Sequence, residues 1–180
     1  MNGALLIQIA RNAIASKLNF STTEIQCTEK EMVELKKPGA SFVTLTQYGD
    51  LRGCIGTLEA YRSLKDDIAA NATASAFRDP RFPPLTLEEW PITEVEISVL
   101  TPPKPIEFKN ENDLFQQIQP GKDGVIIAYG EQRATFLPQV WEQLPEPKQF
   151  FSRLKQKAGL PVEFPCERLH IELYQVQKYR

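Results

Sequence analysis

The sequence predicts an α+β fold in which helices flank a largely antiparallel sheet. Some segments carry apolar residues at three- and four-residue steps, as helices do, and others alternate apolar with polar residues, as strands do. The two kinds of segment follow no strict βαβ order, which disfavours a parallel sheet. The 180 residues are 42% apolar and 24% charged, which is the composition of one folded globular domain.

The first expected elements are a helix and a hairpin. Residues 2–19 place apolar side chains on one helical face. Residues 41–48 are rich in β-branched and aromatic side chains, and residues 51–57 continue after Gly49-Asp50. We therefore expect two antiparallel strands joined at Gly49-Asp50, although this pair is a weaker hairpin signal than Asn-Gly.

A second helix and another strand follow. Ser63 and Asp66 have the spacing of a capping box, and an apolar face continues to about Arg78, where Asp79-Pro80 ends the helix. Apolar residues then alternate with glutamate and serine over residues 94–99, which predicts a strand with one buried face. Prolines shortly after this segment end the strand.

The C-terminal part is expected to contain two helices and three strands. Periodicity and turn residues place them at 112–119 (helix), 125–129 and 133–137 (strands), from Pro147 (helix) and at 169–176 (strand). Proline at the first helical position and Gly159 just beyond the last turn are typical of helix ends.

Charge and cysteine content limit the function classes. The 21 Lys and Arg residues against 23 Asp and Glu leave a formal charge of −2, which gives no general attraction to nucleic acid or to an anionic membrane. Cys27, Cys54 and Cys166 are widely spaced and accompany a single histidine, so we expect neither a zinc site nor a disulfide framework. With no signal peptide or membrane span in the sequence, the expected location is the cytoplasm.

A glycine-flanked cysteine is the most unusual feature of the sequence. Gly53 and Gly56 surround Cys54 in a predicted strand, and Arg52 precedes it. In the functional interpretation the glycines open space around the sulfur, while the arginine favours the nucleophilic thiolate. The alternative is a cysteine buried in the core, which the spacing alone favours.

Four polar residues form a second candidate cluster. Asn71 and Ser75 are four residues apart and share a helix face, so they can present an amide and a hydroxyl to one pocket. Arg78 and Arg81 can hold an anionic group. The alternative is a capped helix end with a local ion pair, which the pattern favours.

Three further residues have open roles. Glu96 lies on the polar face of its strand and is either a general base or a solvated carboxylate. Thr135 is a candidate substrate-binding residue or an ordinary strand residue. We expect His170 at the surface and outside any Cys-His pair. The chain lacks the phosphate-loop, dinucleotide and common hydrolase motifs, so no cofactor and no metal are expected.

Several strings together resemble the AMMECR domain family. They are Phe42-Val43-Thr44-Leu45, Leu51-Arg52-Gly53-Cys54-Ile55-Gly56-Thr57-Leu58, Asn71-Ala72, Ser75-Ala76-Phe77, Asp79-Pro80-Arg81-Phe82-Pro83-Pro84-Leu85, Ile97-Ser98-Val99-Leu100, Pro120-Gly121-Lys122-Asp123-Gly124, Ala134-Thr135-Phe136-Leu137-Pro138-Gln139-Val140-Trp141 and Lys157-Ala158-Gly159-Leu160. Together with the other strings, L-R-G-C-I-G is highly specific for this family. The resemblance spans about residues 5–178.

The resemblance implies one AMMECR domain over residues 1–180, with a larger and a smaller interleaved lobe. It also implies a cleft between the lobes, with Cys54 in or near it. The Phe-Leu-Pro-Gln-Val-Trp string resembles the prokaryotic AmmeMemoRadiSam form, which implies a Memo-like protein and a radical S-adenosylmethionine enzyme as partners. A homodimer is a further candidate assembly.

Three functional hypotheses follow. In the leading one, Cys54 is the nucleophile or covalent ligand of an enzyme-like cleft, Arg52 and Arg81 bind an anionic or nucleotide-like small molecule, and Asn71 or Glu96 orients it or moves protons. The second is a non-catalytic module that binds a substrate or partner for the radical enzyme. A nucleic-acid-binding protein ranks third, because the net charge gives it no support.

Overall fold

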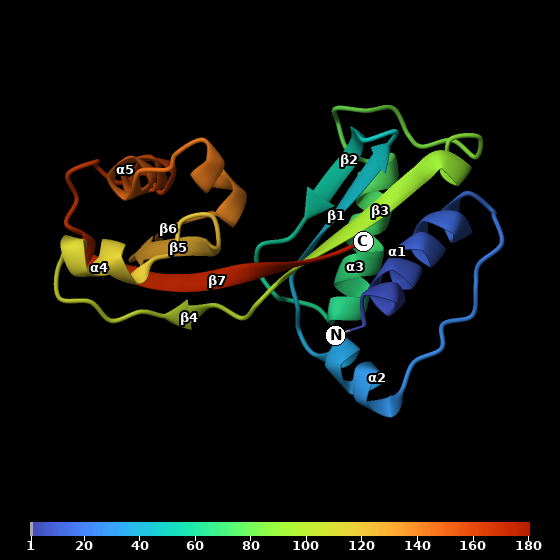
Figure 1. The fold of residues 1–180 in the computed structure, drawn as a ribbon, viewed down its shortest axis with the longest axis horizontal. Coiled ribbons are helices and arrows are strands. Elements are labelled where there is room, and N and C mark those ends of the chain that lie inside the picture. Colours follow the sequence, from blue (N-terminus) through green and yellow to red (C-terminus); the bar gives the residue numbers. More distant parts are fainter. Residues whose placement is uncertain (1) are drawn as a thin grey trace. The chain divides into compact units, whose positions relative to one another are not determined.

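The computed structural model describes residues 2–180, which form two units (Figure 1). Residues 2–100 and 177–180 make up the first unit, and Thr101–Val176 make up the second. Each unit contains antiparallel strands and helices, which confirms the expected α+β class. The cleft implied by the family resemblance stays a prediction.

The first unit is built on a sheet with strand order β2-β1-β3. Helices α1 and α3 pack on the face that carries Val43, Leu45 and Ile97, all of which are fully buried. This face therefore holds the core, and the opposite face of the strands is free of these two helices. The elements of the unit are α1 (Gly3–Lys17), α2 (Glu29–Lys36), β1 (Ser41–Gln47), β2 (Asp50–Gly56), α3 (Leu64–Phe77), the 3₁₀ turn Trp90–Ile92 and β3 (Thr93–Leu100).

The hairpin between β1 and β2 turns one residue earlier than expected. Gln47 pairs with Asp50, so the two turn residues are Tyr48 and Gly49, and both have positive φ (53° and 90°). This is the geometry of a type I′ turn, whose twist suits adjacent strands. The prediction of Gly49-Asp50 was wrong because tyrosine rarely adopts positive φ and gives no turn signal.

Two helix starts are set by side-chain caps. The Ser63 hydroxyl accepts a hydrogen bond from the Asp66 backbone amide at 3.1 Å, as the spacing predicted, and α3 begins at the next residue. Helix α2, which was not expected, starts at a complete capping box between Thr28 and Glu31. Only Leu35 of α2 is buried, so the helix lacks the apolar stripe by which helices are recognised.

The second unit has strand order β4-β7-β5-β6, and all its strand pairs are antiparallel. Its core contains Phe150 and Leu154 of α5 and Trp141, whose ring stacks on Phe150 at 3.7 Å. The elements are β4 (Lys104–Pro105), α4 (Glu111–Gln117), β5 (Asp123–Tyr129), β6 (Gln132–Phe136), the 3₁₀ turn Pro138–Glu142, α5 (Pro147–Lys157), the 3₁₀ turn Cys166–Arg168 and β7 (His170–Tyr179), whose last residues belong to the first unit.

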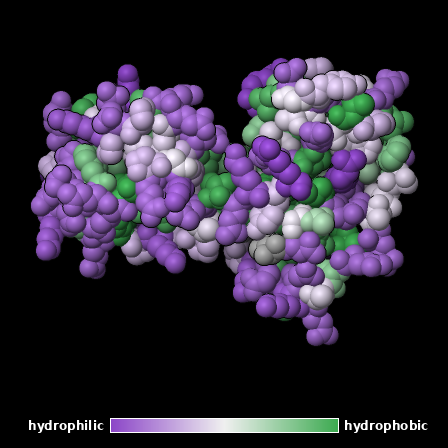
Figure 2. All heavy atoms as spheres, in the orientation of Figure 1, coloured by the Kyte–Doolittle hydropathy of each residue, from purple (hydrophilic) through white to green (hydrophobic). Residues whose placement is uncertain are grey.

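Hydrophilic side chains cover most of the visible face of each unit, and apolar residues appear there as small separate patches (Figure 2). The most exposed large apolar residue is Tyr48 at the hairpin turn. Within residues 2–180, no helix has both the length and the apolar character needed to cross a lipid bilayer.

Candidate active site

Cys54, Thr44 and Glu96 form a row across the sheet of the first unit. Thr44 on β1 is in register with Cys54 on β2 and with Glu96 on β3. Directly paired residues point to the same face, so these three side chains lie on the face opposite Val43 and Leu45. The Cys54 Sγ atom is 3.4 Å from the Thr44 hydroxyl oxygen. We refer to Cys54, Thr44 and Glu96 as the polar row.

The backbone of Cys54 is held by two side chains from outside the sheet. Its N–H donates to Asp79 Oδ2 at 2.8 Å, and its carbonyl oxygen accepts from Arg81 Nη2 at 3.2 Å. Asp79 and Arg81 also bond to each other, through Nε to Oδ1 at 2.9 Å and Nη2 to Oδ2 at 2.7 Å. The ion pair therefore lies along the outer edge of β2. Asp79 holds the N–H of Cys54, and Arg81 holds its carbonyl.

The electrostatics of this ion pair follow from its geometry. Hydrogen bonds from Arg81 hold the pKa of the Asp79 carboxyl far below its ordinary value, and the Cys54 N–H adds to the effect. The same pair raises the pKa of Arg81. Asp79 is buried, whereas 53% of the Arg81 side chain is exposed. Arg81 thus offers a fixed positive charge to solvent beside Cys54.

Glu96, at the other end of the polar row, is paired with two cations. Arg180 donates to its carboxylate, and Lys178 Nζ lies 3.8 Å from Oε1. The Glu96 side chain is 16% exposed, and both cations are largely exposed. Its direction, away from the apolar face of β3, agrees with the sequence pattern. A role as general base stays a prediction.

Arg52 lies at an irregularity in β2 and has a buried side chain. The register shifts by one residue here, because Leu45 pairs with Gly53 and Thr46 pairs with Leu51. Arg52 donates from Nε and Nη2 to the Glu89 carboxylate (2.8 and 3.1 Å).

The remaining contacts of Arg52 are also internal to the first unit. Nη2 donates to the Pro83 carbonyl, and Nη1 is buried without a partner among residues 2–180. Hydrogen bonds from Arg52 lower the pKa of Glu89 to about 2. The contacts of Nε and Nη2 are thus internal to the protein, and substrate binding by Arg52 stays a prediction.

Asn71 belongs to a buried hydrogen-bond network beneath the sheet. Its amide nitrogen donates to the Ser41 carbonyl at 2.9 Å and to Asp67 Oδ2 at 3.0 Å. Asp67 also accepts from Ser41, Thr57 and Arg62. The network joins α3 to β1, so Asn71 has a structural role, and contact with a substrate stays a prediction.

Ser75, Gly53 and Gly56 lie where residues pack closely around the β1–β2 hairpin. The Ser75 hydroxyl accepts from the Ile55 N–H at 2.9 Å and donates to the Val43 carbonyl at 2.7 Å, so it bridges the two strands. A Cβ atom on Gly53 would lie 2.2 Å from the Ser75 carbonyl oxygen, and one on Gly56 would lie 2.2 Å from the Phe42 ring. Ser75 and Phe42 therefore occupy the space that the glycines leave. Substrate binding by Ser75, Gly53 and Gly56 stays a prediction.

The other candidates lie elsewhere. Arg78 is exposed at the C-terminus of α3. Thr135 is on β6 of the second unit, where its hydroxyl is 3.0 Å from the Tyr174 hydroxyl. His170 is exposed on β7, with Nε2 3.8 Å from Glu172. Substrate contacts by Arg78 and Thr135 stay predictions. No group of three His, Cys, Asp or Glu side chains within residues 2–180 is arranged to hold a metal ion.

Sequence reasoning missed Thr44 and Asp79 as members of the site. Alternation with the buried Val43 and Leu45 does place Thr44 on the polar face of its strand. Its position beside Cys54 depends on the hairpin register, which the sequence misassigned at the turn. Asp79 was expected only as a helix terminator and local ion-pair partner, and its bond to Cys54 joins residues 25 positions apart.

Comparisons with known proteins give a single family. The model of the AMMECR1 family matches residues 7–179. A protein from Methanothermobacter thermautotrophicus is 39% identical over 164 residues, covering 88% of this chain and 83% of the relative. A Methanocaldococcus jannaschii protein is 42% identical over 166 residues, covering 88% of this chain and 79% of the relative. The crystal structure of the uncharacterized protein PH0010 from Pyrococcus horikoshii superposes with a TM-score of 0.71 at 34% identity, covering 98% and 89% of the two chains.

Proposed function

Because this chain belongs to the AMMECR1 family, whose relatives cover nearly all of it, we propose that the polar row is the active site of an enzyme acting on a small anionic molecule. Cys54 is the proposed nucleophile, and the exposed Arg81 guanidinium is the proposed binding group for the anion. The proposed substrate class is a nucleotide-like monophosphate, because a guanidinium forms two parallel hydrogen bonds to phosphate.

The observation that carries this proposal is the way Cys54 is held. Both its backbone N–H and its carbonyl are bonded by one ion pair, while its sulfur lies next to a hydroxyl on the face opposite α1 and α3. A nucleophile has to be fixed in position and still be reachable. A cysteine that merely filled the core would lie on the face of Val43 and Leu45 and would need no bonds from Asp79 and Arg81.

The proposed chemical step is a displacement at carbon. The electron pair of sulfur forms a bond to an electrophilic carbon of the anion, and the leaving group departs with the electrons of the broken bond. The thiol proton passes to the leaving group through the Thr44 hydroxyl, which gives up one proton and accepts another. Glu96, in register with Thr44 on the same face of the sheet, is the proposed group for orienting that hydroxyl.

Alkylation by iodoacetamide tests the nucleophile. Cys27 is partly buried like Cys54 but has no such ion pair, so it is the internal control. We expect Cys54 to react faster than Cys27 at pH 7, as measured by mass spectrometry of the peptides. Arg81→Gln should slow the reaction of Cys54 severalfold, because the variant loses the hydrogen bond to the Cys54 carbonyl and the ion pair with Asp79 that holds the Cys54 backbone. Lys65→Gln, an exposed charge on α3, is the matched variant that should change nothing.

Protection from alkylation tests the substrate class. Millimolar AMP should slow the labelling of Cys54, and adenosine at the same concentration should not, because it lacks the phosphate. Equal reactivity of Cys54 and Cys27, in wild type and in Arg81→Gln alike, would contradict a nucleophilic role. Equal protection by adenosine would contradict the anion-binding role of Arg81.

A non-catalytic binding module is the second candidate. The buried bonds of Arg52, Asn71 and Ser75 favour it, since they leave few free polar groups for catalysis. Its proposed partners are a Memo-like protein and a radical S-adenosylmethionine enzyme, and its proposed location is the cytoplasm, where the three unpaired thiols would persist. Co-precipitation of both partners by Cys54→Ala, with pathway activity unchanged, would favour the module over the enzyme.

A further inference from the structure

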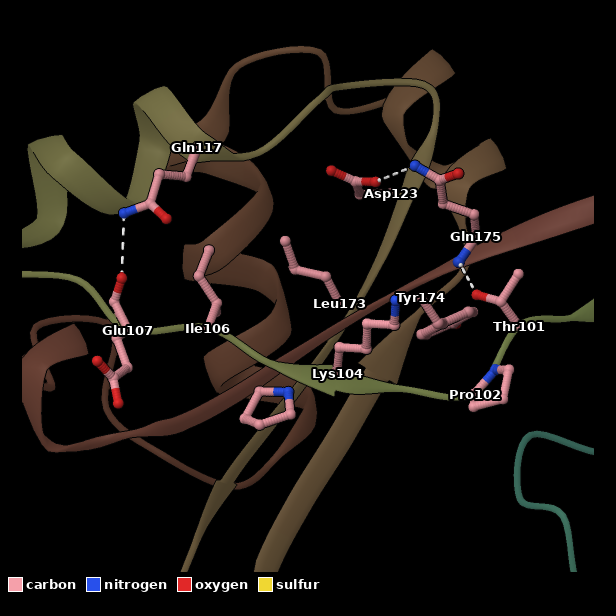
Figure 3. Close-up of a pocket in the computed structure, with 11 residues that line it drawn as sticks. Thr101, Pro102, Lys104, Ile106, Glu107, Gln117, Asp123, Leu173, Tyr174 and Gln175 are labelled. Atoms are coloured by element: carbon pink, nitrogen blue, oxygen red, sulfur yellow. Dashed lines mark hydrogen bonds between the residues drawn. The ribbon is translucent and has the colours of Figure 1, made fainter.

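The second unit contains a cavity of about 660 Å³ (Figure 3). It lies along β4 and β7 and is closed by residues from the end of α4 and the start of β5. Its volume is within the range of small-molecule sites, roughly 300–1,000 Å³. Every lining residue belongs to Thr101–Val176, so the cavity contains no member of the polar row.

The walls of the cavity are braced by hydrogen bonds between different lining segments, drawn as dashed lines in Figure 3. Gln117 Nε2 donates to the Glu107 carbonyl at 3.1 Å, which ties α4 to the chain after β4. Gln175 on β7 donates from Nε2 to Asp123 Oδ1 at 2.9 Å and from its backbone N–H to the Thr101 hydroxyl at 2.8 Å. These bonds connect the segments that line the cavity to one another.

The edge strand that borders the cavity is unsuited to pairing with another strand. Prolines at positions 102, 103 and 105 remove backbone N–H donors from the β4 segment. Lys104 and Ile106 keep the two remaining N–H groups of residues 102–106, and that of Ile106 already donates to the Ile171 carbonyl. An extended peptide would therefore find few partners on this edge, which favours a small molecule as the occupant.

The lining combines an apolar floor with one unpaired cation. Ile106 and Leu173 provide the apolar surface, and Figure 3 shows the Lys104 side chain extending from β4 toward Leu173. Lys104 makes no ion pair with any residue between 2 and 180. The Asp123 carboxylate is already bonded through both oxygens, to Gln175 and to the Gln119 N–H. Glu107 is also in the lining, but Figure 3 shows its carboxylate turned away from Lys104 and Leu173. Lys104 is the one positive charge of the lining and is the group that can pair with an anion.

We propose that this cavity binds a small apolar carboxylate. The carboxylate pairs with Lys104, and the hydrocarbon body lies on Ile106 and Leu173. A dianion such as a phosphate monoester is disfavoured, because Asp123 and Glu107 outnumber the one lysine in the lining and repel additional negative charge. This proposal is independent of the chemistry at Cys54.

The indole N–H signals of the full chain provide a built-in test by ¹H–¹⁵N NMR. The chain has two tryptophans. Trp141 Nε1 donates to the Asp123 carbonyl at 2.8 Å and reports on the cavity wall, whereas Trp90 is buried in the first unit and is the internal reference. Titration with 4-phenylbutyrate should shift the Trp141 signal saturably and leave the Trp90 signal in place. The charge-reversed control, 4-phenylbutylamine, should bind at least several times more weakly.

Two exposed lysines of the second unit form a matched pair of variants. Lys104→Gln should weaken 4-phenylbutyrate binding about fivefold, the size expected for a solvent-exposed ion pair. Lys109→Gln, outside the cavity lining, should bind like wild type. The proposal is overturned by the absence of a saturable Trp141 shift, by equal binding of the amine, or by wild-type affinity in Lys104→Gln. Because Lys104 is exposed, an unchanged spectrum of the free variant verifies its fold.

Discussion

At the level of single residues, Asp79 determines where Cys54 lies. Its buried carboxylate accepts from the Cys54 N–H and from the Arg81 backbone and side chain, so both oxygens are used. Asp79 bonds to the backbone N–H of Cys54 and is therefore a positioning residue. Under the proposed function, Asp79 acts on Cys54 through the backbone of β2 and through the orientation of the Arg81 guanidinium.

Asp79→Asn should destabilise the protein and change the chemistry of Cys54. The loss of charge weakens two bonds from Arg81, and we expect a loss of about 1–3 kcal/mol in the free energy of unfolding in urea. Asp50→Asn, at an exposed position of β2, should change the stability by less than about 0.5 kcal/mol. Asp79→Asn should also slow alkylation of Cys54 relative to Cys27 under native conditions. Unchanged alkylation would assign Asp79 a purely structural role.

The Arg52–Glu89 pair gives the stability a defined pH dependence. The pKa of Glu89 is about 2 in the folded protein and 4.5 as an ordinary value, so the carboxylate contributes stability above pH 4.5 that is lost as the pH falls toward 2. Glu89→Gln should lower the free energy of unfolding by about 1–2 kcal/mol at pH 7, after allowance for partial exposure. The difference from wild type should shrink between pH 4.5 and 2.

Glu88 provides the control for this experiment. It precedes Glu89 but is exposed, so Glu88→Gln should follow the wild-type curve at every pH. Urea titrations monitored by circular dichroism at several pH values measure all three proteins. If the free energy of unfolding of Glu89→Gln is lower than that of wild type by the same amount at every pH, the ion pair is not the cause of the difference.

At the level of elements, helix α3 and the hairpin approach as closely as their backbones allow. Gly53→Ala would place a Cβ atom 2.2 Å from the Ser75 carbonyl oxygen, and backbone cannot move aside as a flexible side chain can. We expect a loss of about 2–4 kcal/mol in the free energy of unfolding, at or above the usual cost of overpacking. Gly130→Asn is the control: its surroundings are open, and asparagine tolerates the φ of +56° found there. Equal stability of Gly53→Ala and wild type would contradict this packing.

The helices with clear sequence signals were predictable, and the polar row was not. Helix α3 was expected from its Ser63 cap and apolar spacing, whereas α2 buries only Leu35 and was missed despite its capping box. The face on which Glu96 lies was expected from alternation along β3 alone. Its place beside Thr44 depends on the pairing of β1 with β3, which are far apart in sequence, and local patterns do not determine such pairing.

At the level of the whole molecule, the two units have separate apolar cores. Ile68 belongs to the core of the first unit and Leu154 to that of the second, and both are fully buried. Ile68→Ala and Leu154→Ala should each cost about 2–5 kcal/mol by leaving a cavity. Hydrogen exchange followed by mass spectrometry should show faster exchange mainly in the unit that carries the substitution. Uniform acceleration in both units by either variant would show that they open together.

The division of the chain has a consequence for its synthesis. The first unit consists of residues 2–100 and 177–180. The 76 residues of the second unit, Thr101–Val176, are therefore translated before the last four residues of the first unit. A ribosome-bound chain can already pair β1, β2 and β3 and can fix Cys54 with Asp79 and Arg81, but it leaves Glu96 without Lys178 and Arg180. The carboxylate end of the polar row is therefore completed only after residues 178 and 180 have been translated and have emerged from the exit tunnel.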